Sequence, residues 1–386
     1  MNEVVVHTES FPCASLRERT AQARLTHAAT DTNKQLLTSR TSRPSRTMYA
    51  EEEVFGKGLG CIATEEILPG CLVLRETPCL FLPPEEEEGS TLLQRTLRAF
   101  LVMTSEEQEK YLQLANMFDK DESEWSETAR KDMENIHSEL ETQPFTGLLS
   151  SDIIQIWQIK LTNGFHNGVF LKMSRFNHSC WPNAEYFWNA DTRTRDVRAV
   201  RTILPREEIL LDYRQPWTLT RDERRRSLKE NFNFDCFCEV CNASPGDLAM
   251  ESEECDKFLQ LSKQRLTSAN DTPDDLLNEI LTLKNMHKMA IEMKTIKKSL
   301  TLKYIIETWF DDSCQGVLMV GKSGEKNEIK NFFIAEAFSS VSLGLNLSSI
   351  IYGEEHSNTL KWVGRERDPI NFFLGENFPG SEEYIY

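Results

Sequence analysis

Three cysteines lie within six residues of one another, in the spacing Cys236-x-Cys238-x-x-Cys241. This spacing lets three thiolates turn toward one point, and a fourth ligand from elsewhere would complete a tetrahedral zinc site. Cys180, in the stretch SRFNHSCWPNAEYF, is the candidate for that ligand. Four thiolates leave no open position for water, so such a zinc would be structural and would clamp the chain after residue 230 against the loop near residue 180. The alternatives are free cysteines and a thiol redox role.

The composition is that of an ordinary globular protein, since 39% of the 386 residues are apolar, and it suits one large domain or two modest ones. The formal net charge of −17 argues against general affinity for nucleic-acid phosphates and favours basic protein partners. No apolar run is long enough to span a membrane, and the N-terminus lacks the apolar core of a secretory signal. We therefore expect an intracellular protein of the cytoplasm or nucleus, with no membrane partner and with reduced cysteines.

The first 48 residues differ from the rest of the chain. They contain seven Lys or Arg against four Asp or Glu, and they show no sustained helical or strand period. We expect a disordered leader. A mitochondrial presequence is the alternative, although Glu3, Glu9 and Glu18 stand where such peptides avoid acids.

The remaining chain alternates between strand-rich and helical stretches. Short apolar runs punctuated by Gly and Pro predict small strands in 49–84 and again in 169–213, and acidic amphipathic helices are expected between them. Thr220 and Glu223 predict a capping box that opens a short basic helix. Long helices are expected beyond residue 245, including one over 273–300 and one that ends at Gly353. The expected divisions are the leader 1–48, the first part of a domain at 49–84, an acidic helical insert 85–150, the second part of the same domain at 151–217, the cysteine segment 218–245 and a helical C-terminal domain 246–386.

Four motifs occur in an order that is typical of one family. They are the turn Gly56-Lys57-Gly58-Leu59-Gly60, the motif N-H-S-C-x-P-N that begins at Asn177, the strand end Asp212-Tyr213, and C-x-C-x-x-C. Residues 51–242 thereby resemble the SET domain of protein lysine methyltransferases, and within it the SET and MYND domain subgroup. No cysteine occurs between Cys79 and Cys180, so the MYND zinc module of that subgroup is absent. The resemblance implies an α+β fold of small β-sheets with a pseudoknot-like active site, a zinc-bound post-SET segment and a helical C-terminal domain.

The resemblance also implies an activity, namely transfer of a methyl group from S-adenosylmethionine to the side-chain amine of a lysine in a protein. It assigns a catalytic role to Tyr213, whose hydroxyl would orient the methyl donor and the incoming amine. Phe232 would line the substrate channel, where many relatives have Tyr, and this leaves the number of methyl groups added open. Core packing is the alternative role for Tyr213 and Phe234. The residues implied in cofactor binding are Lys57, Gly58, Leu59, Asn163, Phe176, Asn177, His178, Tyr213 and Phe234.

Two further functions stay open on the sequence alone. The first is a SET-like scaffold that has lost catalysis and binds basic protein tails. The second is a zinc-dependent interaction protein unrelated to methyl transfer. In the methyltransferase reading the partner is a lysine-containing, basic protein, histone or non-histone, and no direct contact with nucleic acid is expected.

Overall fold

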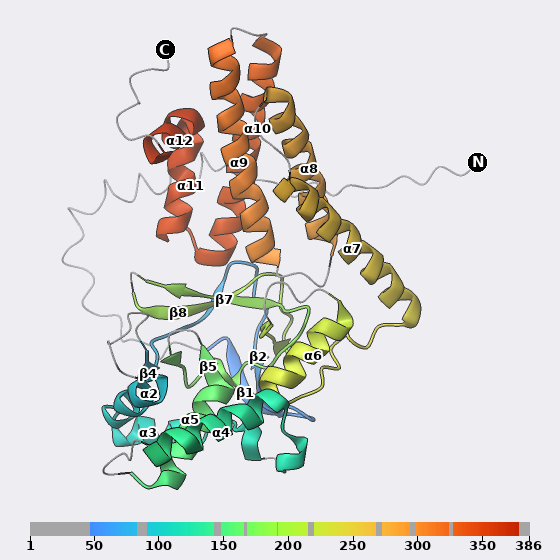
Figure 1. Ribbon diagram of the computed structural model, residues 1–386. Helices are drawn as coiled ribbons and strands as arrows, with labels where there is room; N and C mark the ends of the chain where they lie inside the picture. Colours follow the sequence, from blue (N-terminus) through green and yellow to red (C-terminus); the bar gives the residue numbers. More distant parts are fainter. Residues whose placement is uncertain are drawn as a thin grey trace, which may run out of the picture. The chain divides into compact units, whose positions relative to one another are not determined.

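The computed structural model describes most of the chain beyond the N-terminal leader (Figure 1). The described residues from Met48 onward belong to one compact unit. The leader expected over 1–48 lies outside the described residues, except for its last two. The described ranges are 47–82, 91–119, 121–142, 148–165, 168–190, 192–214, 220–267, 272–293, 298–323 and 327–377.

Short antiparallel strands form three small sheets in the described part of the chain (Figure 1). Gly and Pro interrupt the apolar runs, which keeps each strand short. The first sheet has the order β1-β2-β9, with β1 at Tyr49–Val54, β2 at Gly58–Ala63 and β9 at Glu208–Ile209. The second has the order β3-β8-β7, with β3 at Leu72–Glu76, β8 at Thr194–Ala199 and β7 at Ala184–Asn189. The third has the order β4-β6-β5, with β4 at Leu80–Phe81, β6 at Gly168–Val169 and β5 at Gly164–Phe165.

The glycine-rich stretch makes the tight turn between β1 and β2. Val54 pairs with Gly58, and the amide of Lys57 donates to the carbonyl of Val54 at 3.0 Å. Gly56 and Gly58 have φ angles of 72° and 74°, which lie in the left-handed region that favours glycine. The turn therefore depends on these two glycines.

The segment that contains β9 is hydrogen-bonded on both of its sides. On one side Ile209 pairs with Cys61 of β2. On the other side the amide of Leu211 donates to the carbonyl of Asn177, and the amide of Ser179 donates to the carbonyl of Leu211, each at 2.9 Å. This central position brings the loop at 177–180 close to the glycine-rich turn, although the two are more than a hundred residues apart in sequence.

Helices fill the region between the two strand-rich parts, as the sequence predicts. Thr91 and Thr104 each open a helix with a capping box, which satisfies the first backbone amides. The apolar faces share a core that includes Leu97, Tyr111 and Ile156. The helices are α2 (Leu92–Leu101), α3 (Ser105–Leu112), α4 (Glu127–Thr142) and α5 (Ser150–Asn163), and the short 3-10 turns are η1 (Met117–Asp119), η2 (Glu122–Glu124) and η3 (Met173–Arg175).

Helices make up most of the described chain after residue 220, apart from the cysteine segment between α6 and α7. The capping box expected at Thr220 and Glu223 is confirmed at the start of α6. The expectation of one helix over 273–300 is wrong, because α8 ends at Glu292 and Met293 is extended, with φ −65° and ψ 127°. The side chain of Met293 is buried in the helical core, so packing rather than a local Gly or Pro accompanies the end of the helix. The helices are α6 (Arg221–Phe232), α7 (Pro245–Thr267), α8 (Pro273–Glu292), α9 (Lys298–Ser323), α10 (Asn327–Tyr352), α11 (Ser357–Arg367) and α12 (Pro369–Asn377).

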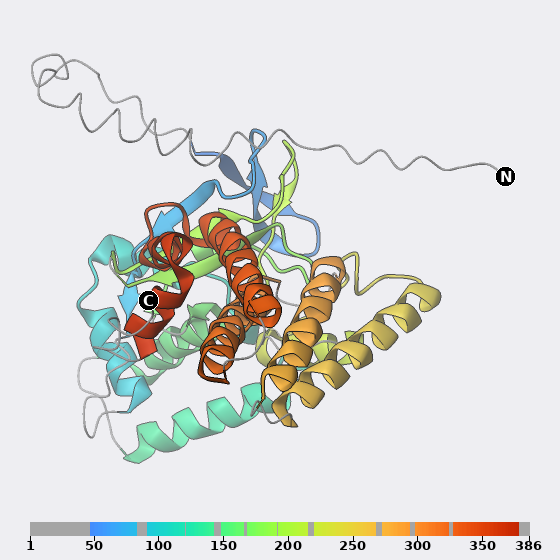
Figure 2. The ribbon, with the colours of Figure 1, turned by 90° about the horizontal axis from the view of Figure 1, so that it is seen from above.

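Helix α10 ends before Gly353, as expected, and it lies beside α9 (Figure 2). Among the described residues it is the one helix that is long and apolar enough to cross a membrane, with a mean hydropathy of 1.3. However, its residues Phe333, Ala337 and Val341 are buried in the helical core, and Glu336 accepts a hydrogen bond from Lys284 at 2.7 Å. These contacts are those of a core helix in a bundle.

Candidate active site

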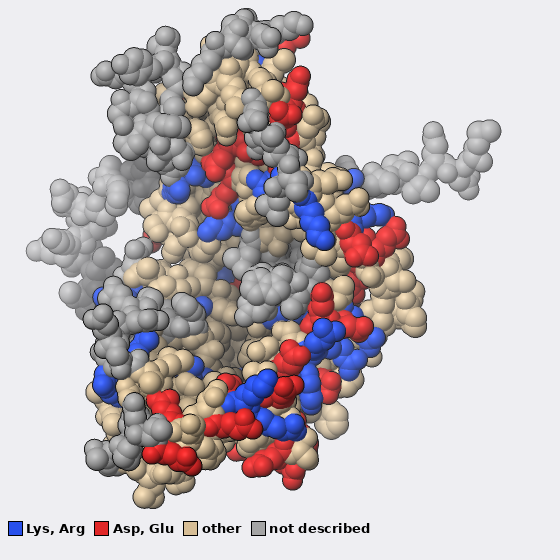
Figure 3. All heavy atoms as spheres, viewed as in Figure 1, with Lys and Arg blue, Asp and Glu red and all other residues tan. Residues whose placement is uncertain are grey.

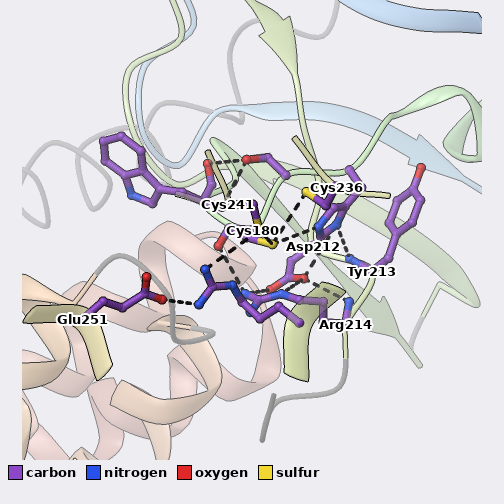
Figure 4. A network of polar contacts seen from close by, with 11 residues as sticks. Cys180, Asp212, Tyr213, Arg214, Cys236, Cys241 and Glu251 are labelled. Atoms are coloured by element: carbon purple, nitrogen blue, oxygen red, sulfur yellow. Dashed lines mark hydrogen bonds and ion pairs between the residues drawn. The ribbon is translucent and has the colours of Figure 1, made fainter. Parts of the chain in front are cut away.

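Four cysteine sulfurs lie close together, and Figure 4 labels three of these cysteines, Cys180, Cys236 and Cys241. The Sγ atoms of Cys180, Cys236, Cys238 and Cys241 all lie within 4.8 Å of one another. The sulfur of Cys180 is 3.5 Å from that of Cys241 and 3.9 Å from that of Cys236. The structure therefore brings together the four cysteines that the sequence led us to expect at one site.

The end of α6 directs the chain toward this point. Asn233 caps the helix in the left-handed conformation, with φ 54° and ψ 36°, which Asn tolerates better than most residues. The chain therefore turns away from the helix axis just before Cys236. A tight turn follows, in which the amides of Cys241 and Asn242 both donate to the carbonyl of Cys238.

The cluster fits a tetrahedral metal ion. Around zinc, with Zn–S bonds of about 2.3 Å, neighbouring thiolates lie about 3.8 Å apart. The two measured separations from Cys180 lie close to that value. Hydrogen bonds from Cys180, and then from Cys236 and Cys241, lower the pKa of Cys238, whereas hydrogen bonds from Cys236, Cys238 and Cys241 raise the pKa of Cys180. Cys238 is thus the thiol of this pair that loses its proton more readily, and the thiolate is the form that binds metal.

Three arginines surround the sulfurs. Nη2 of Arg214 donates to the carbonyl of Cys180 at 3.1 Å, and Nε of Arg221 donates to the carbonyl of Cys241 at 2.9 Å. Arg224 is fully buried, with Nη2 3.9 Å from Sγ of Cys241, and it forms an ion pair with Glu251 of α7. Four thiolates around one zinc ion leave two negative charges in excess, and these cations offset them. Sequence reasoning missed all three. Arg221 and Arg224 belong to a run of arginines on a short helix, which is typical of a solvated face, and Arg214 lies before that helix, directly after Tyr213.

His178 connects the cysteine cluster to Tyr213. Its Nδ1 accepts a hydrogen bond from the backbone amide of Tyr213 at 3.1 Å, so the ring proton of the neutral form resides on Nε2. Nε2 lies 3.3 Å from Sγ of Cys180, to which it donates. One imidazole thus spans the backbone of Tyr213 and a cysteine of the cluster.

Tyr213 lies among aromatic rings. Its ring centroid is 5.2 Å from that of Phe232 and 5.3 Å from that of His178, and Phe234 lies 5.9 Å from His178. The phenol donates a hydrogen bond to the carbonyl of Phe176. Burial raises the pKa of Tyr213, so the hydroxyl keeps its proton at neutral pH. This group can donate and orient, but it is not a base.

A second polar cluster lies at the glycine-rich turn. The amide nitrogen of Asn177 donates to the carbonyl of Leu59 at 3.2 Å and to Oε1 of Glu208 at 2.9 Å. Nζ of Lys57 donates to Oε2 of the same Glu208 at 2.6 Å. Glu208, which the sequence predicts only as part of a strand, therefore joins Lys57 to Asn177, and Asn177 in turn contacts Leu59.

Asn163 belongs to a different bonding pattern. It lies at the end of α5 and donates from Nδ2 to the carbonyls of Ala115 and Ile159, at 2.7 and 2.9 Å. Both amide protons are thus used within the protein, so any contact between Asn163 and a ligand would go through its side-chain oxygen.

Comparison with known protein families identifies the region that contains the glycine-rich turn, Cys180 and Tyr213. A model of the SET domain family matches residues 58–214. Residues 58–214 are a SET domain. The SET domain begins at Gly58 inside the glycine-rich turn and ends at Arg214, directly after Tyr213. It includes Cys180, whereas Cys236, Cys238 and Cys241 lie beyond its end.

The relatives of this SET domain are named as lysine methyltransferases. The chain is 31% identical over 195 residues to the histone-lysine N-methyltransferase set5 of Schizosaccharomyces pombe, and the match covers 50% of each protein. It is 37% identical over 90 residues to the protein-lysine N-trimethyltransferase SMYD5 of Mus musculus, covering 23% of this chain and 22% of the relative. It is 32% identical over 118 residues to the histone-lysine N-methyltransferase Smyd1 of Mus musculus, covering 27% and 24%. The matches thus span half or less of the length of these curated relatives.

Proposed function

We propose that the protein is a protein-lysine N-methyltransferase that uses S-adenosylmethionine. The observation that carries the proposal is the Tyr213 phenol at the end of a SET domain, next to the aromatic rings of Phe232 and His178. The names of the relatives support the same activity. A scaffold without catalysis is not favoured, because the chain keeps the polar and aromatic groups that the reaction needs.

Bound S-adenosylmethionine supplies an electrophilic methyl carbon on a sulfonium sulfur. The task of the protein is then to position the lysine amine in line with that carbon and to present it without its proton. A free lysine, with a pKa near 10.4, is neutral only about once in a thousand molecules at neutral pH. Burial among the rings of Tyr213 and Phe232 would favour the neutral amine, and the Tyr213 hydroxyl would orient it.

We further propose roles for the other expected residues. The turn of Lys57, Gly58 and Leu59 would approach the amino acid end of the cofactor, because glycine leaves room for close backbone contact. Asn163, Phe176, Asn177 and His178 would form the remainder of the pocket, with the adenine against Phe234. The supporting contacts are those that join Leu59 to Asn177 and His178 to Tyr213.

The cysteine cluster would hold one structural zinc ion. The proposal rests on the convergence of four thiols at tetrahedral spacing and on the arginines around them. The ion would clamp the segment after α6, and with it Phe234, against the loop that contains Cys180. Together with the central position of residues 208–211, this clamp would give the pseudoknot-like active site of the family. The clamped segment would be the post-SET segment, and the domain divisions would be those expected from the sequence.

The proposed substrate is a basic, lysine-containing protein of the cytoplasm or nucleus, such as a histone or a ribosomal protein. The net charge of −17 supports a basic partner. Acidic and basic side chains are nevertheless interspersed on the face seen in Figure 3, so attraction by the whole surface does not by itself select a target.

Incubation of the purified chain with methyl-labelled S-adenosylmethionine and a mixture of core histones and ribosomal proteins tests the proposal. We expect label in protein, and mass spectrometry should locate it on lysine side chains that carry one or more added methyl groups. Calorimetry with S-adenosylhomocysteine should show one binding site per chain. Absence of both labelled lysine and cofactor binding would contradict the proposal. The remaining function would then be a catalytically inactive scaffold that binds basic protein tails.

A further inference from the structure

Glu208 lies between two residues of the proposed cofactor site. Its carboxylate accepts from Nζ of Lys57 at 2.6 Å and from the amide of Asn177 at 2.9 Å. It is held by β9, which pairs with β2 directly beyond the glycine-rich turn. Only 14% of the Glu208 side chain is exposed, against 42% for Lys57. A rigid strand thus presents a partly buried negative charge at the turn.

The close approach of Glu208 and Asn177 depends on a glycine. A Cβ atom at Gly60 would lie 2.8 Å from Nδ2 of Asn177 and 2.8 Å from Oε1 of Glu208. These distances are shorter than carbon atoms tolerate, so any larger residue would displace the pair. The amide nitrogen of Asn177 is fixed by Glu208 and by the carbonyl of Leu59, so its side-chain oxygen is the atom left to accept from a ligand.

The charges match one part of S-adenosylmethionine. The amino acid end of the cofactor is a zwitterion with an ammonium and a carboxylate group. Lys57 and Glu208 are the complementary cation and anion, and the Asn177 oxygen is a neutral acceptor for the ammonium.

We propose that Glu208 binds the α-ammonium group of the cofactor, and that Lys57 leaves Glu208 to bind the cofactor carboxylate. The ion pair of the free protein is thereby exchanged for two ion pairs with the ligand. This inference rests on the proposed function, because it names a binding residue of that same site. Charge-assisted hydrogen bonds of this kind are stronger than neutral ones, so the exchange favours zwitterionic ligands.

The same sheet contains a comparable ion pair that lacks these features. Arg206 donates to Glu52 of β1 at 2.6 Å, with 72% of the Arg206 side chain and 36% of the Glu52 side chain exposed. The hydrogen bonds between Arg206 and Glu52 do not involve Asn177. Exposed ion pairs of this kind contribute little to the stability of a protein. Glu52→Gln is therefore a matched control for Glu208→Gln.

The test compares two ligands by calorimetry on the full chain. One is S-adenosylhomocysteine, and the other is its deamino analogue, in which hydrogen replaces the ammonium group. Glu208→Gln should weaken binding of S-adenosylhomocysteine by about tenfold, the size of one charge-assisted hydrogen bond, and should leave binding of the deamino analogue unchanged. Lys57→Gln should weaken both ligands alike, because both keep the carboxylate. Glu52→Gln should change neither affinity.

Equal losses for the two ligands in Glu208→Gln, or no loss for either, would overturn the inference. If the wild-type chain failed to bind S-adenosylhomocysteine at all, the proposed function itself would fail, so the two failures are distinguishable. If Glu208→Gln does not fold, the comparison is made with Glu208→Asp, whose shorter side chain retracts the carboxylate. In Glu208→Asp, the ratio of the affinity for S-adenosylhomocysteine to the affinity for the deamino analogue must then fall below the wild-type ratio. An unchanged ratio would contradict the inference.

Discussion

The Tyr213→Phe chain is expected to fold and to bind S-adenosylhomocysteine as the wild type does. Its rate of methyl transfer should fall by about a hundredfold to a thousandfold, which is the usual effect of removing one positioned donor from an active site. The phenol keeps its proton because burial raises its pKa, so its role is to donate and to orient. Removing the hydroxyl leaves the ring against Phe232 and His178. The loss should therefore appear in kcat, measured with saturating labelled cofactor.

The structure offers a matched control for this change. The hydroxyl of Tyr111 donates to the carbonyl of Ile156 at 2.7 Å, in the helical core away from the SET site. Tyr111→Phe and Tyr213→Phe each remove one hydroxyl-to-carbonyl bond, at a cost of about 1 kcal/mol of stability. Only Tyr213→Phe should lose activity. Equal activity in the two variants would show that the Tyr213 hydroxyl has no part in the reaction.

Cys238→Ser is expected to lose zinc and to destabilise the chain by more than about 3 kcal/mol, because metal binding to a structural site is coupled to folding. The ion would no longer hold the segment after α6, and His178 and Arg224 would lose the ordered sulfur cluster that they contact. Metal content per chain and thermal unfolding measure the two effects. Cofactor affinity should fall as well, because Phe234 lies on the released segment.

Cys71→Ser is the control, since Cys71 is also partly buried but lies outside the cluster. It should keep its zinc and unfold close to the wild-type temperature. A strong chelator should destabilise the wild type and the Cys71 variant, and it should have little further effect on the Cys238 variant. Full zinc content and an unchanged melting temperature in Cys238→Ser would contradict the structural role.

The sequence predicts best what is encoded locally. The spacing of the three cysteines, the paired glycines of the β1–β2 turn and the capping box at Thr220 each follow from the conformational demands of a few neighbouring residues. Cys180 also lies beside the other three sulfurs, as expected, although it is distant from them in sequence. There the chemistry of a four-ligand shell supplied the constraint, since three thiolates require a fourth.

Contacts that depend on the tertiary fold could not be read in the same way. Glu208 looks like the polar position of an alternating strand, and it becomes a partner of Lys57 and Asn177 only because β9 lies against β2. Arg224 looks like one of several solvated arginines until α7 brings Glu251 to it. The end of α8 likewise involves the burial of Met293, which no local Gly or Pro announces.

Zinc-edge X-ray absorption of the purified chain tests most directly whether four sulfurs from distant parts of the sequence close this site around one ion. The account predicts one zinc ion per chain with four sulfur neighbours at about 2.3 Å and no oxygen or nitrogen neighbour. A chain purified without zinc, or a zinc ion bound by fewer than four sulfurs, would contradict it.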